Sequence, residues 1–327
     1  MFTHILVPLD GSPRAESSLP VVARIARASG GSIVFVQVVS PPVDYGGGLA
    51  AGGSLLTGEM IETEMEEATS YLKTVASSPV LAGIETTSEV MFGSPAMDIL
   101  AVAESREVDL IVMCSHGRTG FTRWILGSVA HQLVHQSAVP VLVLRESEPP
   151  LFLSHADTKR SVCAFVPLDG SPLAETALVP AAHLVAALAA PAQGVLHLAQ
   201  VVKIDRPMVA GGFASELHEG VLNCTKAYLA KVIERLQATL KDLKLSITWS
   251  VSSEADVADA LVGMAEYGSA GKETGDGGGN DLIAISTHGR GAVERWVMGS
   301  VTERLLNTTK LPMLIVRPQK IEEETPY

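Results

Sequence analysis

Three absences narrow the function of this 327-residue chain. Cysteine is scarce, and the three residues, Cys114, Cys163 and Cys224, form no CxxC pair, so we expect neither a disulfide framework nor a zinc site. Runs of Lys and Arg are missing and the net charge is −12, which argues against nucleic acid or an anionic membrane as the partner. No apolar run is long enough to span a bilayer and no signal peptide is evident, so we expect a cytoplasmic protein.

What the chain does have is a glycine-containing motif that occurs twice. The first copy is Cys114-Ser115-His116-Gly117-Arg118, and nine residues separate Gly117 from Gly127-Ser128. The second copy is Ser286-Thr287-His288-Gly289-Arg290, and nine residues again separate Gly289 from Gly299-Ser300. In each copy an apolar run typical of a buried strand precedes the motif, and the Gly-Ser pair opens a helical pattern. Glycines let backbone N–H groups approach an anion, and a helix N-terminus favours negative charge. The motif therefore predicts a phosphate site in each copy.

A second repeat fixes the domain organisation. Residues 7–13 recur letter for letter at 166–172, which is 159 residues later, whereas the glycine motif recurs after 172 residues. The second half has therefore gained about thirteen residues, many of them within 268–280, which we interpret as a tolerated insertion. Because the segment between the halves contains two prolines and mixed charges, we predict domains at 1–146 and 161–319, joined by a linker at 147–160.

Alternating strand and helix patterns predict the fold class. In the first half, five apolar runs at 4–9, 32–39, 84–91, 109–113 and 141–144 alternate with four helical segments, the first of them covering 13–28. Such alternation indicates parallel strands joined by right-handed crossovers. We therefore expect an α/β protein with a doubly wound, Rossmann-like five-stranded parallel sheet in each half and helices on both faces. The loops after strands one, two and four should converge on one crevice at the carboxyl ends of the strands.

These motifs resemble the universal stress protein family, with two domains in tandem covering nearly the whole chain. Nucleotide-binding members of that family carry Gly-x2-Gly-x9-Gly-(Ser/Thr), and their first strand ends in a Val-Pro-x-Asp-Gly-Ser type of sequence. The resemblance implies an adenine nucleotide alpha hydrolase-like fold and ATP as the ligand, which could be bound with or without a magnesium or manganese ion. It also implies pairing through the last strands, here 141–144 and 313–316 within one chain, with a homodimer of such chains as an open alternative.

Carried over residue by residue, the resemblance implies one nucleotide site in each half. Asp10 and Asp169 would contact the nucleotide, and Val38 and Val201 would meet the adenine through their backbone. The first site would comprise Pro8, Asp10, Val38, Cys114, His116, Gly117, Arg118, Gly127, Ser128 and Val129. The second would comprise Pro167, Asp169, Val201, Ser286, His288, Gly289, Arg290, Gly299, Ser300 and Val301. The chain departs from the family pattern at its first glycine, which is Cys114 in one half and Ser286 in the other.

Other interpretations of the same residues stay open at this point. Asp10 and Asp169 could ligate a metal on the phosphates or simply cap the following helix. His116 and His288 have no partner carboxylate or nucleophile at a defined spacing, so we interpret them as loop-shaping residues and assign no catalytic residue. Three functions remain: an ATP-binding stress-response module, an enzyme that is at most a slow ATPase, and a scaffold that has lost the nucleotide. The chain lacks Gly-x4-Gly-Lys-(Ser/Thr), and we expect the first function.

Overall fold

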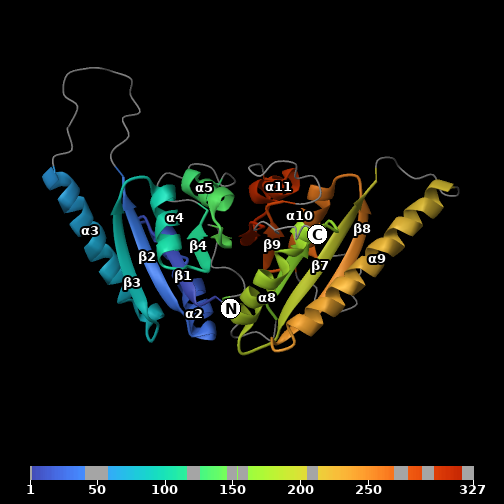
Figure 1. Cartoon of the computed structure of the whole chain (residues 1–327), viewed down its shortest axis with the longest axis horizontal. Helices are drawn as coiled ribbons and strands as arrows, with labels where there is room; N and C mark the ends of the chain where they lie inside the picture. The colour runs from blue at the N-terminus through green and yellow to red at the C-terminus, as the bar shows by residue number, and fades with distance from the viewer. Residues whose placement is uncertain are drawn as a thin grey trace, which may run out of the picture.

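The two halves of the chain join in one sheet. The computed structural model describes residues 2–40, 58–115, 126–145, 153, 161–204, 213–268, 279–288 and 298–318. Within these residues, ten strands form a single sheet in the order β3-β2-β1-β4-β5-β10-β9-β6-β7-β8, with helices on both faces (Figure 1). Each half contributes five parallel strands, which confirms the predicted fold class.

The N-terminal half follows the predicted alternation. Its strands are β1 (His4–Pro8), β2 (Ser32–Val39), β3 (Thr86–Phe92), β4 (Leu110–Cys114) and β5 (Val141–Leu144). Its helices are α1 (Pro13–Glu16), α2 (Leu19–Ser29), α3 (Gly58–Ala76), α4 (Pro95–Ser105) and α5 (Ser128–Gln136), with a 3-10 turn, η1, at Pro79–Leu81. The predicted strand boundaries are correct within two residues at each end.

The C-terminal half repeats this order. Its strands are β6 (Cys163–Pro167), β7 (Gly194–Lys203), β8 (Leu245–Glu254), β9 (Leu282–Ser286) and β10 (Met313–Val316). Its helices are α7 (Pro172–Glu175), α8 (Leu178–Ala189), α9 (Phe213–Thr239), α10 (Val257–Tyr267) and α11 (Ser300–Thr308). The predicted linker, apart from residue 153, and most of the predicted insertion at 268–280 lie outside the described residues.

The predicted first helix at 13–28 is wrong in one respect, because it is two helices, α1 and α2. The hydroxyls of Ser17 and Ser18 donate back to the carbonyls of Arg14 and Ala15, each at 2.7 Å, which competes with the helical hydrogen bonds. Pro20 has no backbone N–H, so it cannot donate a helical hydrogen bond at this point of the chain. The second half is also divided, between α7 and α8, where the hydroxyl of Thr176 donates to the carbonyl of Leu173 at 2.6 Å.

The two halves meet through an antiparallel pair of strands. Leu142 of β5 lies opposite Leu314 of β10, which confirms the predicted pairing of the last strands within one chain. Two arginines cross the junction. Arg145 donates to the carbonyl of Leu306 near the end of α11, and Arg317 donates at 3.1 Å to the carbonyl of Gln136 at the end of α5. Burial lowers the pKa of Arg145 to about 10.

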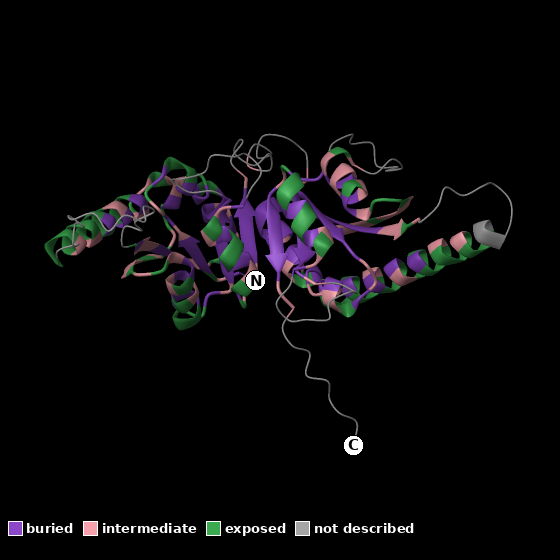
Figure 2. Cartoon of the chain, turned by 90° about the horizontal axis from the view of Figure 1, so that it is seen from above, coloured by how far each residue is buried: buried purple, intermediate pink, exposed green. Residues whose placement is uncertain are grey.

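Buried side chains cover both faces of the sheet. Along β1, Ile5 and Val7 belong to the cluster under α2, α3, α8 and α9, whereas Leu6 belongs to the cluster under α4, α5, α10 and α11. Figure 2 shows the central strands buried and the outer faces of the helices exposed. The stretch Pro172–Ala189 is apolar enough by composition to cross a membrane, but 56% of it is buried and it is broken between α7 and α8, as is typical of a core element.

Candidate functional site

Each half contains one large cavity at the carboxyl ends of its strands. The N-terminal cavity has a volume of about 810 Å³ and the C-terminal cavity about 1060 Å³. In both, the walls come from the loop after the first strand, the end of the second strand, the end of the fourth strand, and the start of the helix that follows the glycine motif. These volumes are in the range of small-molecule sites. The predicted crevice is therefore present twice.

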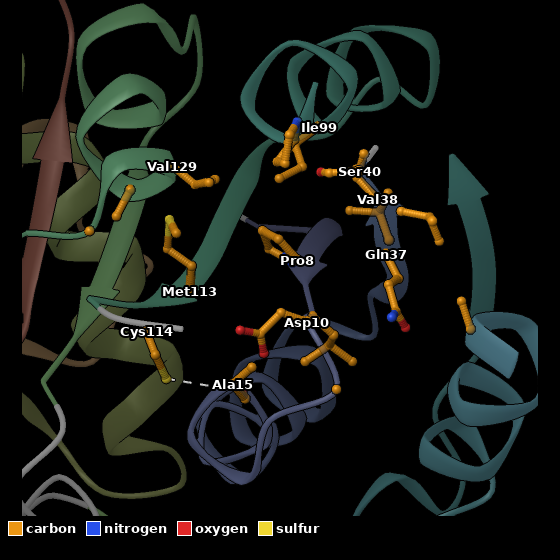
Figure 3. A pocket seen from close by; sticks show the side chains of 18 of the residues that line it. Pro8, Asp10, Ala15, Gln37, Val38, Ser40, Ile99, Met113, Cys114 and Val129 are labelled. Carbon is orange, nitrogen blue, oxygen red and sulfur yellow. Dashed lines mark hydrogen bonds between the residues drawn. The ribbon is translucent and has the colours of Figure 1, made fainter. Parts of the chain in front are cut away.

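The structure brings the described candidate residues together. Around the N-terminal cavity lie Pro8, Asp10, Val38, Cys114, Gly127, Ser128 and Val129 (Figure 3). Around the C-terminal cavity lie Pro167, Asp169, Val201, Ser286, His288, Gly299, Ser300 and Val301. His116, Gly117, Arg118, Gly289 and Arg290 lie outside the described residues. Contact of any of these residues with a nucleotide stays a prediction.

The loop after the first strand is held by an aspartate and a serine. The backbone N–H and the hydroxyl of Ser12 donate to Asp10 Oδ1 at 3.0 and 2.6 Å, and Ser12 Oγ accepts from the N–H of Ala15 at 3.2 Å. In the second half the N–H of Ser171 donates to Asp169 Oδ1 at 2.9 Å, and Ser171 Oγ accepts from the N–H of Ala174 at 3.1 Å. The serine is therefore the N-cap of the short helix, and the interpretation of the aspartates as helix caps is wrong. Each aspartate instead fixes the turn from the edge of its cavity.

The helices after the glycine motifs begin with glycine N-caps. No side chain in the described residues caps α5 at Gly127 or α11 at Gly299. The glycine N–H groups donate to the carbonyls of Ser115 and Thr287 at 2.8 and 2.9 Å, which ties each helix start to the preceding strand. The φ angles of −59° and −61° are open to any residue, so the backbone does not require glycine here. First-turn amides at the edge of a cavity, with room beside them, favour an anion.

The residues that replace the first glycine of the family pattern are held against α1 in the first half and the end of α7 in the second. Cys114 Sγ donates to the carbonyl of Arg14 at 3.0 Å and lies 3.3 Å from Ser17 Oγ, and Figure 3 shows its sulfur turned toward Ala15. Ser286 Oγ lies 3.5 Å from Thr176 Oγ1. Both side chains are buried. Both residues nevertheless line their cavities.

Sequence reasoning missed the outer wall of both cavities. Tyr71 of α3 lines the N-terminal cavity and donates to Glu16 Oε1 at 3.0 Å, and Tyr228 of α9 lines the C-terminal cavity and donates to Glu175 Oε1 at 2.9 Å. Burial and the Glu175 carboxylate raise the pKa of Tyr228. Glu16 and Glu175 are 159 residues apart, as are Asp10 and Asp169. This repeat was the sequence signal that could have identified the glutamates as equivalent residues of the two cavities.

A metal centre built from protein side chains alone is not found in the described part of the chain, where no three His, Cys, Asp or Glu residues are placed to hold an ion. Asp10 and Asp169 lie at the edges of their cavities, which are also lined by Glu64 and Glu67 in the N-terminal half and by Glu303 in the C-terminal half. Either aspartate could supply one oxygen ligand to a cation that arrives with a phosphate group.

The chain is similar to universal stress proteins over nearly its whole length. The sequence profile of the universal stress protein family matches residues 1–145 and 273–317. A universal stress protein of Methanocaldococcus jannaschii is 34% identical over 149 residues, 45% of this chain and 84% of the relative. One from Mycolicibacterium smegmatis is 23% identical and spans 96% of this chain and 97% of the relative. The crystal structure of a universal stress protein from Archaeoglobus fulgidus shares the fold, with a TM-score of 0.63 at 20% identity over 96% of this chain and 98% of that one.

Proposed function

The chain belongs to the universal stress protein family, and we propose that it is a stress-response module that holds an adenine nucleotide in each of its two cavities. The observation that carries the proposal is a repeated arrangement: a glycine-capped helix start and an aspartate line the same cavity in both halves. We assign the two nucleotide domains to residues 1–146 and 161–319.

The proposed roles combine the geometry of the cavities with what the family resemblance implies. Amides in the first turns of α5 and α11 would donate to the phosphate groups, because these N–H groups have no acceptor within their own helix. Val38 and Val201, near the ends of β2 and β7, would meet the base through their backbone. Asp10 or Asp169 would supply one carboxylate oxygen to a divalent cation that accompanies the phosphate groups. We propose binding rather than hydrolysis, with ADP in place of ATP as the result that would favour a slow ATPase.

The nucleotide content of the purified protein is the first test. The protein is denatured, and the released nucleotide is separated by chromatography and counted per chain. Two adenine nucleotides per chain are expected, and one per chain would restrict the proposal to one half. No nucleotide, together with no heat of binding when ATP and magnesium are added, would contradict the proposal and favour a scaffold that has lost its ligand.

Cys224 offers a reporter for the C-terminal cavity. It is exposed and lines that cavity, whereas Cys114 and Cys163 are buried. We therefore expect a thiol reagent to modify Cys224 first and ATP at saturating concentration to slow that reaction at least about tenfold. Labelling that proceeds at the same rate with and without ATP would contradict occupancy of this cavity.

A variant and a matched control separate ligand binding from folding. A Cβ at position 299 would lie 3.5 Å from the carbonyl of Thr287, which is ordinary contact, so Gly299→Ala should fold. The added methyl group stands at the start of α11 and should weaken the protection of Cys224 by ATP. Gly263→Ala makes the same chemical change on α10, where a Cβ has no neighbour within 4 Å, and should leave the protection unchanged. If ATP protects Cys224 equally well in both variants, the proposal that the start of α11 binds phosphate is contradicted.

A further inference from the structure

The outer walls of the two cavities can be compared position by position. Tyr71 on α3 and Tyr228 on α9 make the same hydrogen bond to equivalent glutamates, so they mark the same place in each half. Counting four and seven residues back from each tyrosine gives Glu67 and Glu64 on α3, and Cys224 and Val221 on α9. All four line their cavities. The comparison therefore rests on contacts as well as on helix register.

The chemistry of these positions differs between the halves. Glu64 and Glu67 present two exposed carboxylates along the wall of the N-terminal cavity, which also contains Asp10. Val221, 49% exposed, and the exposed Cys224 present no charge to the C-terminal cavity at the same places. A surface valine and cysteine facing a cavity make an apolar wall, and two carboxylates make an anionic one. The C-terminal cavity is also lined by Lys203 and Glu303, which have opposite charges, so the N-terminal cavity keeps an excess of two negative charges over the C-terminal one.

Building on the proposed function, we propose that the two cavities sort nucleotides by charge. The C-terminal cavity holds the nucleoside triphosphate. The N-terminal cavity favours a nucleotide with fewer phosphate charges, or one whose charge a divalent cation has neutralised. The physical reason is Coulomb repulsion between the α3 carboxylates and the phosphate groups in a shared, water-containing space.

The size of the effect follows from the charges. ATP carries about two more negative charges than AMP, and each is repelled by two additional carboxylates across a distance of about 10 Å. In water this amounts to roughly a tenfold change in the ratio of ATP to AMP affinity at low ionic strength. At physiological salt the screening length is about 8 Å, so the ratio should shrink as salt is added.

The test uses the full chain with one cavity closed at a time. Gly299→Glu closes the C-terminal cavity and Gly127→Glu the N-terminal one, by placing a carboxylate at the helix start where phosphate would bind. Both positions have φ angles that a side chain tolerates. Calorimetric titration with ATP and with AMP, at low salt and without magnesium, then gives the affinity ratio of each cavity. We expect the ratio of ATP affinity to AMP affinity to be at least about tenfold higher in the C-terminal cavity than in the N-terminal cavity.

Charge variants then assign the difference to the wall. With only the N-terminal cavity open, Glu64→Gln combined with Glu67→Gln should move the ratio about tenfold toward ATP. The matched control is Glu62→Gln with Glu66→Gln, which makes the same change of net charge on α3 at exposed positions that do not line the cavity. The control should move the ratio by less than about twofold.

The converse substitution makes the C-terminal cavity resemble the N-terminal one. With only the C-terminal cavity open, Val221→Glu combined with Cys224→Glu should move the ratio about tenfold toward AMP. Both positions are exposed, so the fold should tolerate the change.

The outcomes separate this inference from the proposed function. Equal ATP-to-AMP ratios in the two cavities, or equal effects of the wall variants and their control, overturn the inference while nucleotide binding stands. Absence of any nucleotide binding in either background overturns the proposed function, and the inference with it.

Discussion

The antiparallel junction between the halves makes a quantitative prediction about stability. Leu142 on β5 and Leu314 on β10 are direct partners and are both fully buried, so their side chains share one packing site. Opposed residues of an antiparallel pair have Cβ atoms about 5 Å apart. Each substitution to alanine should therefore remove contacts of its own and contacts with the partner.

The magnitude follows from cavity formation. Leu142→Ala and Leu314→Ala should each lower the free energy of unfolding by about 3 kcal/mol, because a buried leucine leaves a cavity that relaxes only in part. In the double variant the contact between the two side chains is lost once rather than twice. The double variant should therefore be more stable than the sum of the two single effects predicts, by roughly 0.5 to 1 kcal/mol.

Urea denaturation followed by circular dichroism measures all four corners of this cycle. The control cycle pairs Leu142→Ala with Leu196→Ala. Leu196 is also fully buried, but β7 is four strand spacings from β5, about 19 Å, so the two effects should add. Additivity at the junction, equal to that of the control, would refute the argument that Leu142 and Leu314 share a packing site across the two halves.

Three further predictions concern the local features of the fold and site. Ser12→Ala removes the N-cap of α1 and should cost about 1 kcal/mol of unfolding free energy, measured by thermal denaturation, with Ser88→Ala at an exposed position of β3 as a serine control. Gly127→Ala should weaken ATP binding without unfolding the protein, and unchanged affinity in a folded variant would contradict phosphate approach at the start of α5. Burial lowers the pKa of His183, so the folded state resists its protonation, and stability should fall as the pH drops through about 6.5, where the unfolded chain takes up the proton. His183→Gln should flatten that part of the pH profile of unfolding, and an unchanged profile would assign the pH dependence to other groups.

Local sequence signals determined the elements and the candidate sites. Parallel buried strands are nearly continuous apolar runs, so β4, β5 and β10 could be placed within one residue. The Gly-Ser pairs predicted the starts of α5 and α11, because the residue at a helix N-cap has a non-helical backbone conformation that glycine readily adopts. The repeat of residues 7–13 at 166–172 then predicted that the same cavity would appear twice.

The sequence prediction of one helix at 13–28 failed because side-chain hydroxyls compete for the backbone carbonyls that a continuous helix would use. The helical spacing of residues 13–28 is continuous, but the hydroxyls of Ser17 and Ser18 and the missing N–H of Pro20 break the ladder between α1 and α2. The same loop shows that capping depends on geometry. Asp10 and Ser12 are both good N-cap residues by type, and only the folded structure shows that Ser12 accepts from Ala15 while Asp10 accepts from Ser12.

The sequence by itself determined the α/β class, the tandem repeat, the family and the places of the two cavities, because these depend on periodicity and on motifs within one or two elements. Only the tertiary structure decided which residues form the outer walls. Glu64 and Glu67 on α3, and Val221 and Cys224 on α9, are far in sequence from the glycine motifs and reach the cavities only because the long helices pack across the sheet. Contacts between distant segments depend on that packing and leave no local periodicity, so the charge difference between the cavities became visible only in the fold.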